Sequence, residues 1–129
     1  MKKINNQTYL LENPVYIHET ASIVGPKEKD GPMANYFDTL LEDEFWGEKS
    51  WEKAESKIVK ETVNSLISKT NLSSKDIDFC FAGDLLNQCI ASNFAYRDSN
   101  IPFIGLFGAC STFIESMIVA SSFIDGNYD

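Results

Sequence analysis

The chain has 129 residues, with 11 lysine and arginine side chains against 19 aspartate and glutamate side chains, a formal net charge of −8 at pH 7. This acidic balance argues against nucleic acid as a partner and against electrostatic attachment to anionic lipid, because both need clustered cations. Hydrophobic residues make up 43% and charged residues 23%, a composition typical of one soluble globular domain.

The sequence shows no sign of a membrane or export segment. No apolar run approaches the roughly 20 residues that a membrane-spanning helix needs. The basic start at Met1–Lys3 is not followed by the apolar stretch of a signal peptide. The three cysteines are odd in number and widely spaced, which fits a reducing compartment better than a disulfide framework. We therefore expect a location inside the cell.

The first fifty residues predict strands and then a long surface excursion. Apolar and β-branched residues over 8–24 predict one or two strands, which end at the Gly25-Pro26 turn. Residues 25–50 hold two Gly-Pro pairs and the acidic cluster Glu42–Glu44, so we expect an excursion with a short helix around 33–41. The acidic cluster is expected to be solvated.

The rest of the chain predicts helices that alternate with buried strands. Ser50 is expected to cap a helix over 51–69, whose apolar residues recur at helical spacing. The strands expected next are residues 77–83 and 101–108, and the helices that follow them are residues 85–99 and 111–124. This order is typical of parallel strands joined by right-handed crossovers, so we expect an α/β layered fold with a mostly parallel sheet.

Charge is unevenly distributed along the chain. Residues 79–124 carry only the charged side chains Asp84, Arg97, Asp98 and Glu115. A segment so poor in charge is usually buried on several sides, but a chain of this length has too little interior to hide it. We expect the chain either to dimerise through this segment or, as we favour, to be the front part of a larger domain. Alone, it is expected to expose apolar surface and to self-associate.

The sharpest candidate for chemistry is Cys110, at the junction between a predicted strand and the helix after it. Backbone N–H groups at a helix N-terminus lower the pKa of a thiol and stabilise an oxyanion or a carboxylate. Gly108 and Ala109 are small, which permits the sharp turn that a nucleophile at such a junction requires. The alternative is that Cys110 is only a small buried residue of the core.

A second candidate follows the preceding strand, where Asp84 begins a run that also contains Asn87. Ligands of open α/β sheets gather at the carboxyl ends of the strands, so we expect Asp84 to face the same crevice as Cys110. The alternative, that Asp84 caps the following helix, is compatible with this role.

Four other residues have structural interpretations. His18, the one histidine, is expected at the surface, since nothing places it near a cysteine. Cys80 and Cys89 lack metal-ligand spacing and are expected to pack in the core. Glu115 lies early in an apolar helix, where it either complements the positive end of the helix or points into a polar pocket.

Two long runs resemble the stage V sporulation protein AD family: Asp76–Gln88 (DIDFCFAGDLLNQ) and Ile101–Thr112 (IPFIGLFGACST). The shorter runs Glu12–Pro14 and Val24–Glu28 resemble it as well, so the resemblance extends over essentially the whole chain. Members of that family are longer than this chain and have a thiolase-like, or β-ketoacyl synthase-like, fold. The resemblance therefore implies that residues 1–129 are the incomplete N-terminal part of a thiolase-like domain.

The same resemblance implies a function in spore-forming bacteria. The protein would bind dipicolinic acid, without catalysis, as the developing spore is loaded with this compound. Cys110 would stand at the position of the acyl-accepting cysteine of thiolase-like enzymes. However, Phe113 and Glu115 replace the small or apolar residues usual after that cysteine, and the partner residues of an acyl-transfer site would lie outside this chain.

From this resemblance we expect dipicolinate to contact Cys110, Ser111, Asp84 and Asn87. The helix N-terminus at Cys110 would hold one carboxylate of the ligand. We expect no protein metal site and no cofactor, apart from calcium bound together with dipicolinate.

The expected partners are dipicolinic acid and other proteins of the spore inner-membrane channel assembly, with a homodimer as the full-length form. The expected location is the cytoplasmic side of the forespore or spore inner membrane, as a peripheral protein. Two alternatives stay open: an acyl-transfer enzyme that uses Cys110 as its nucleophile, and a structural docking subunit of a spore membrane complex.

Overall fold

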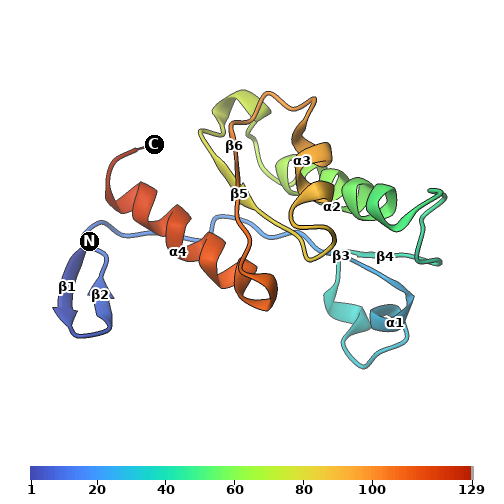
Figure 1. Cartoon of the computed structure of the whole chain (residues 1–129), viewed down its shortest axis with the longest axis horizontal. Coiled ribbons are helices and arrows are strands. Elements are labelled where there is room, and N and C mark those ends of the chain that lie inside the picture. The colour runs from blue at the N-terminus through green and yellow to red at the C-terminus, as the bar shows by residue number, and fades with distance from the viewer. Residues whose placement is uncertain (129) are drawn as a thin grey trace.

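Small sheets and α-helices alternate in the computed structural model, which describes residues 1–128 (Figure 1). The strands are β1 (Lys2–Asn5), β2 (Thr8–Leu10), β3 (Ile23–Val24), β4 (Thr39–Leu40), β5 (Cys80–Ala82) and β6 (Phe103–Gly105). The α-helices are α1 (Pro26–Lys29), α2 (Trp51–Ser68), α3 (Ile90–Tyr96) and α4 (Thr112–Asp125). Short 3₁₀ turns lie at Ala34–Tyr36, Ser74–Asp76 and Ala109–Ser111.

The parallel pair β5 and β6 organises the second half of the chain. Cys80, Phe81 and Ala82 lie opposite Phe103, Ile104 and Gly105. Two parallel neighbours need a crossover connection, and the segment that contains α3 supplies it. The α/β class and the parallel strands expected from the sequence are confirmed in this unit.

Helices cover both faces of this small sheet. On one face Phe123 of α4 packs against Phe79 and Phe81, with ring centroids 5.1 and 4.9 Å apart. On the other face Tyr96 of α3 stacks on Phe103 at 4.7 Å. Successive side chains of a strand point to opposite faces, so α3 and α4 lie on opposite sides of β5. In Figure 1, α2 lies beside α3, on the side away from α4.

A half-buried thiol lies between α3 and the sheet. The Sγ atom of Cys80 donates a hydrogen bond to the Tyr96 hydroxyl at 2.8 Å. Burial raises the pKa of both groups, because neither anion would be solvated there. Cys80 therefore packs as a structural residue, as expected from its spacing.

The prediction of a helix around residues 33–41 is wrong. Only Ala34–Tyr36 form a 3₁₀ turn, and Thr39–Leu40 instead form β4, paired in parallel with β3. The reason is a tertiary contact that local sequence does not reveal. Asp38 accepts a hydrogen bond at 2.8 Å from the backbone N–H of Ser22, which aligns the two strands.

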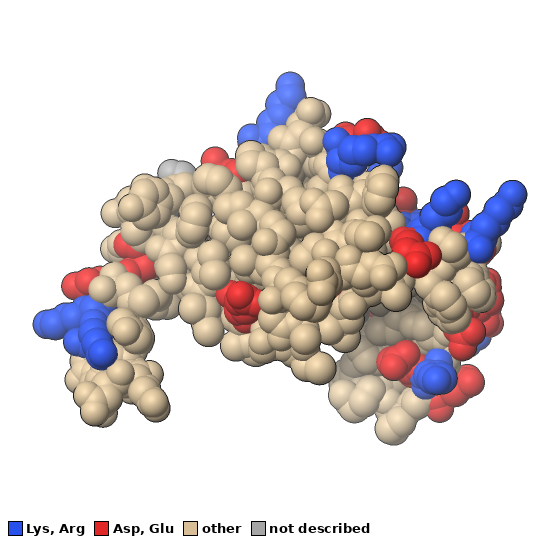
Figure 2. Space-filling model, viewed as in Figure 1, with Lys and Arg blue, Asp and Glu red and all other residues tan. Residues whose placement is uncertain are grey.

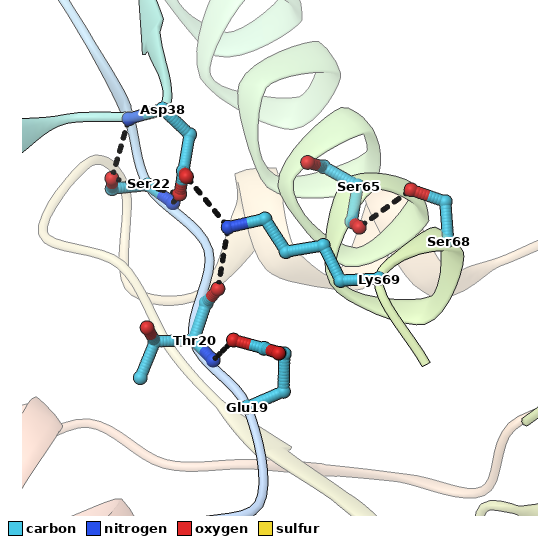
Figure 3. Close-up of polar contacts among 7 residues, drawn as sticks. All are labelled: Glu19, Thr20, Ser22, Asp38, Ser65, Ser68 and Lys69. Carbon is cyan, nitrogen blue, oxygen red and sulfur yellow. Dashed lines mark hydrogen bonds and ion pairs between the residues drawn. The ribbon is translucent and has the colours of Figure 1, made fainter. Parts of the chain in front are cut away.

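Figure 3 shows how this contact joins three separate segments. The Ser22 hydroxyl accepts a hydrogen bond from the backbone N–H of Asp38 at 3.1 Å. Lys69, just after α2, donates to the Asp38 carboxylate at 2.6 Å and to the carbonyl of Thr20 at 2.8 Å. The Lys69 ammonium, followed by the Ser22 N–H, lowers the pKa of Asp38. Strands β3 and β4 are thereby attached to the end of α2.

Strand structure in residues 8–24 is limited to β2 and β3. The β-branched stretch around residues 15–17 is not a strand, and Tyr16 and Ile17 are exposed. At the start of the region, β2 forms a hairpin with β1, which lies before it in the sequence and pairs with it antiparallel. This hairpin projects from the body at the N-terminus (Figure 1).

Helix boundaries agree with the sequence for α2 and differ for α3. The Ser50 hydroxyl accepts from the N–H of Lys53 and caps α2, as expected. The helix expected over 85–99 begins only at Ile90, because Asn87, Gln88 and Cys89 adopt left-handed φ values of 52°, 55° and 69°. A left-handed residue other than glycine costs roughly 1–2 kcal/mol, which is why sequence propensity did not indicate this turn.

The end of α4 has a Schellman motif. Gly126 is the C-cap residue, with a right-handed φ of −86°. The left-handed residue is Asn127, with φ 56°. The N–H groups of Asn127 and Tyr128 bind the carbonyls of Ile124 and Phe123, each at 3.1 Å, which satisfies the last carbonyl groups of the helix.

Asp125 anchors the N-terminal segment to this end of α4. Its buried carboxylate accepts from the backbone N–H groups of Glu12 and Asn13 at 2.5 and 2.7 Å, and it pairs with the Met1 α-ammonium. The Asn13 amide donates to the Asp125 carbonyl at 2.9 Å. The Met1 ammonium, followed by the Asn13 N–H, lowers the pKa of Asp125.

Much apolar surface stays uncovered in the described structure. The accessible area is 9080 Å², against about 6,900 Å² for a compact monomer of 14.5 kDa. Helix α4 exposes the large apolar side chains Phe113, Ile114, Met117 and Ile118. Figure 2 shows a face with little charge between the charged groups at its margins. The low-charge segment thus exposes apolar surface, as its composition predicted.

Gly83 offers a test of the packing between β5 and β6. A Cβ atom there would lie 1.9 Å from the Leu106 carbonyl oxygen and 2.9 Å from the Thr112 methyl group. Gly83→Ala is therefore expected to lower the free energy of unfolding by about 1–3 kcal/mol or more in urea denaturation. Gly105→Ala is the control, since its Cβ would meet only the Phe103 ring, at 3.4 Å. Equal losses for the two variants would contradict this account.

Two substitutions of Asp125 test the anchor of the N-terminal segment. Asp125→Ala is expected to lower the urea midpoint more than Asp125→Asn, because an asparagine oxygen still accepts from the N–H groups of Glu12 and Asn13. Indistinguishable midpoints would mean that these hydrogen bonds contribute nothing.

The same pair has a defined pH dependence. The folded pKa of Asp125 lies below its ordinary 3.8, so its contribution is complete above pH 3.8 and is lost as pH falls through the folded value. The Met1 α-ammonium has a pKa above its ordinary 8.0, so its contribution is complete below pH 8.0 and is lost as pH rises. The stability difference between the native chain and Asp125→Asn is thus expected to be largest between these values; a pH-independent difference would refute the ion pair.

Candidate functional site

A mostly apolar cleft opens along the edge of β5 that is not paired with β6. Its volume is about 670 Å³, and every residue from Phe79 to Leu85 lines it. Side chains of α2 and α4 form its walls, among them Leu66 and Met117. Small-molecule sites typically occupy about 300–1,000 Å³ with mainly apolar linings, so the cleft has the size and character of a ligand site.

Cys110 lies in the 3₁₀ turn that leads from β6 into α4, and it lines the cleft. The turn is sharp, because Ala109 has a left-handed φ of 51°. The Thr112 hydroxyl oxygen accepts from the N–H of Gly108 at 3.0 Å, which holds the turn against the helix. The thiol is exposed rather than buried in the core, at the strand–turn–helix junction that the sequence predicted.

Asp84 lines the same cleft from the end of β5, so the structure brings it together with Cys110. Its residue is only 7% exposed. One carboxylate oxygen accepts from the backbone N–H of Ser92 at 2.8 Å and so caps α3. The other oxygen is buried and has no hydrogen-bond partner in the described part of the chain. The capping role considered from the sequence is therefore present, and one oxygen remains unpaired.

The side-chain charge at this end of the cleft is negative. Among residues 1–128, Asp84 is the only charged residue that lines the cleft. Glu55 of α2 lies close enough that burial and the Asp84 charge together raise its pKa. An anionic ligand therefore needs positive potential from elsewhere, such as the N-terminus of α4 or a bound cation.

Asn87 and Ser111 do not line the cleft. The Asn87 amide donates to the Glu52 carboxylate at 3.1 Å on the exposed side of α2. The Ser111 hydroxyl donates to the Gly108 carbonyl at 2.7 Å, within the turn that carries Cys110. Their contact with a ligand stays a prediction.

Sequence reasoning singled out few of the residues that line the cleft, and three of those it missed are Leu85, Thr112 and Ser116. A signal for two of them was available. Thr112 and Ser116 are four residues apart, so they share the face of α4 that begins beside Cys110. Leu85 had no such signal, because its place depends on the left-handed turn before α3.

Glu115 does not line the cleft. Its carboxylate reaches back to Gly108, where an added Cβ would lie 2.5 Å from one oxygen. Glu115 therefore lies at the positive end of α4, the first of its two expected placements.

The remaining expected features are structural. Cys89 is buried and His18 is exposed, as predicted. In the acidic cluster, Glu42 pairs with Lys29 at the surface, and Asp43 accepts from the N–H of Phe45 at 3.0 Å.

Residues 1–128 have neither a cluster of metal-ligating side chains nor a membrane-spanning helix. No group of three or more His, Cys, Asp or Glu side chains in this range is placed to hold a metal ion. Within the same residues, no helix combines the length and the apolar character that a membrane crossing requires.

Comparison with known proteins adds a family to this geometry. The sequence model of a family described as stage V sporulation protein AD matches residues 5–129. Stage V sporulation protein AD of Bacillus subtilis (strain 168) is 42% identical over 128 residues, which are 99% of this chain and 38% of that relative. The chain thus spans well under half the length of the curated relative that it matches.

Proposed function

Because this chain belongs to the stage V sporulation protein AD family, we propose that it binds dipicolinic acid in the cleft beside Cys110. In this proposal the protein acts without catalysis and takes part in loading dipicolinate into the developing spore. The observation that carries it is the mostly apolar cleft at the start of α4, which Asp84 and Cys110 both line.

The shape and lining of the cleft suit a small aromatic ligand. Phe79, Phe81 and Phe113 are among its lining residues, and aromatic rings pack favourably on one another. The N-terminal end of α4 offers backbone dipoles to one carboxylate of the ligand, next to Cys110 and Ser111. Ring and carboxylate would thus meet different parts of the same cleft.

The negative charges of Asp84 and of the ligand need a positive charge between them, which calcium would supply. In the described part of the chain, the Asp84 carboxylate is the only charged group in the lining, and it would repel a free dianion. Calcium bound together with dipicolinate offsets this repulsion, because carboxylate oxygens are its preferred ligands. Groups from the part of the family's length that this chain does not span are a second source of positive charge.

We also propose that residues 1–129 are the N-terminal part of a thiolase-like domain. The parallel pair β5–β6 with helices on both faces is compatible with such a domain, and the uncovered face of α4 is suited to contacts with further chain or with partners. The proposed setting is the cytoplasmic side of the forespore or spore inner membrane. There the protein would be a peripheral homodimer that contacts other proteins of the channel assembly.

Calorimetric titration of dipicolinate, with and without calcium, tests the proposed function. Two proteins are compared: this chain alone, and a chimera in which it replaces the matched segment of the B. subtilis relative. Saturable binding is expected in the chimera at least, and Asp84→Ala with Cys110→Ala is expected to reduce it. Absence of binding in both proteins at millimolar ligand would refute the proposal and favour a docking subunit that uses the exposed face of α4.

An acyl-transfer enzyme is the second candidate, favoured by the exposed Cys110 thiol at the mouth of the cleft. The thiolate would attack the carbonyl of an acyl-CoA thioester, and the CoA thiol would leave. This function predicts a gain of one acyl group on Cys110 after incubation with acyl-CoA, measured by peptide mass spectrometry. Cys89, which is buried, is the internal control; an unchanged mass of the Cys110 peptide would exclude this candidate.

A further inference from the structure

Leu85 is an exposed apolar side chain that borders the cleft. It lies at the carboxyl end of β5, directly after Asp84, and it is 61% exposed. It nevertheless lines the main cleft, and it also lines a smaller hollow against Trp51 and Ile58 of α2. Leu85 therefore stands at the rim that separates these two hollows.

The turn that carries Leu85 is held by several contacts. Asn87, Gln88 and Cys89 are all left-handed, a conformation that residues other than glycine keep only where the surroundings impose it. The Cys89 thiol donates to the Leu106 carbonyl at 3.0 Å, and the Asn87 amide donates to Glu52. The Asp84 carboxylate caps α3 on the other side of the leucine. The backbone of the turn that carries Leu85 is thus held by contacts within the chain itself.

We propose that Leu85 determines the ligand specificity of the cleft by packing its side chain against the ring of a flat aromatic ligand. This inference rests on the proposed function, because it takes the ligand to be a dicarboxylate on an aromatic ring. Ligand binding would remove an exposed leucine from water, which favours a ring over an open-chain dicarboxylate. The apolar Leu85 side chain would contact the ring of the ligand and not its carboxylates.

The neighbouring Leu86 provides a matched control. It is the same residue type in the same turn, and it lines the smaller hollow against α2 but not the cleft. Truncation of either leucine removes the same atoms from the chain. Only truncation of Leu85 removes them from the cleft that Cys110 lines.

The experiment compares two ligands on three proteins. The ligands are dipicolinate and iminodiacetate, which has two carboxylates around one nitrogen but no ring. The proteins are the native sequence, Leu85→Ala and Leu86→Ala, each in whichever form binds dipicolinate in the titration above. Leu85→Ala is expected to weaken dipicolinate binding about tenfold, the loss typical of a few missing apolar contacts, and to leave iminodiacetate binding unchanged. Leu86→Ala is expected to match the native protein, and Leu85→Met to restore binding, because methionine has a similar volume.

The outcomes separate this inference from the proposed function. If the native protein does not bind dipicolinate, the proposed function fails and this inference fails with it. If the native protein binds and Leu85→Ala binds equally well, only the role of Leu85 is overturned. An equal loss for both ligands would also overturn it, because it would show a general effect on the structure rather than contact with the ring.

Discussion

The close approach of two strand ends is the constraint on which the candidate site depends. Gly83 follows β5 at the point where the chain after β6 passes, and the Leu106 carbonyl leaves no room for a side chain. This approach keeps the carboxyl ends of the two parallel strands together. The residues that follow each strand, Asp84 and Cys110, consequently line one cleft although they are far apart in the sequence.

The chemistry of the cleft follows from how its few polar groups are used. One carboxylate oxygen of Asp84 accepts a hydrogen bond from the N–H of Ser92, so Asp84 already stabilises α3 without a ligand. The Cys110 thiol is exposed and lies just before the N-terminus of α4, where partial positive charge accumulates. The remainder of the lining is mostly apolar. A ligand with a flat ring and an acidic edge uses all three properties, provided that positive charge offsets Asp84.

The large exposed surface of the chain and its partial coverage of the relative agree with each other. The chain matches 99% of its own length to a relative of which it spans 38%, and its accessible area exceeds that of a compact monomer of its mass. The excess of about 2,200 Å² on this one chain is larger than the roughly 800 Å² that each partner buries in a standard protein interface. Much of the apolar surface belongs to α4, which begins beside the candidate site. The cleft and the uncovered face are therefore neighbouring parts of one structure.

The sequence by itself determined the α/β class, the cap and length of α2, the junction at Cys110 and the exposure of the low-charge segment. These features depend on local residue spacing or on composition, both of which can be read directly from the sequence. Only the tertiary structure decided the conformation of residues 33–41 and the start of α3 at Ile90. Hydrogen bonds between residues distant in the sequence, such as Asp38 with Ser22, override local propensity. The place of Leu85 at the rim of the cleft belongs to the same class. It depends on a left-handed turn whose stability comes from contacts with α2 and with the chain after β6.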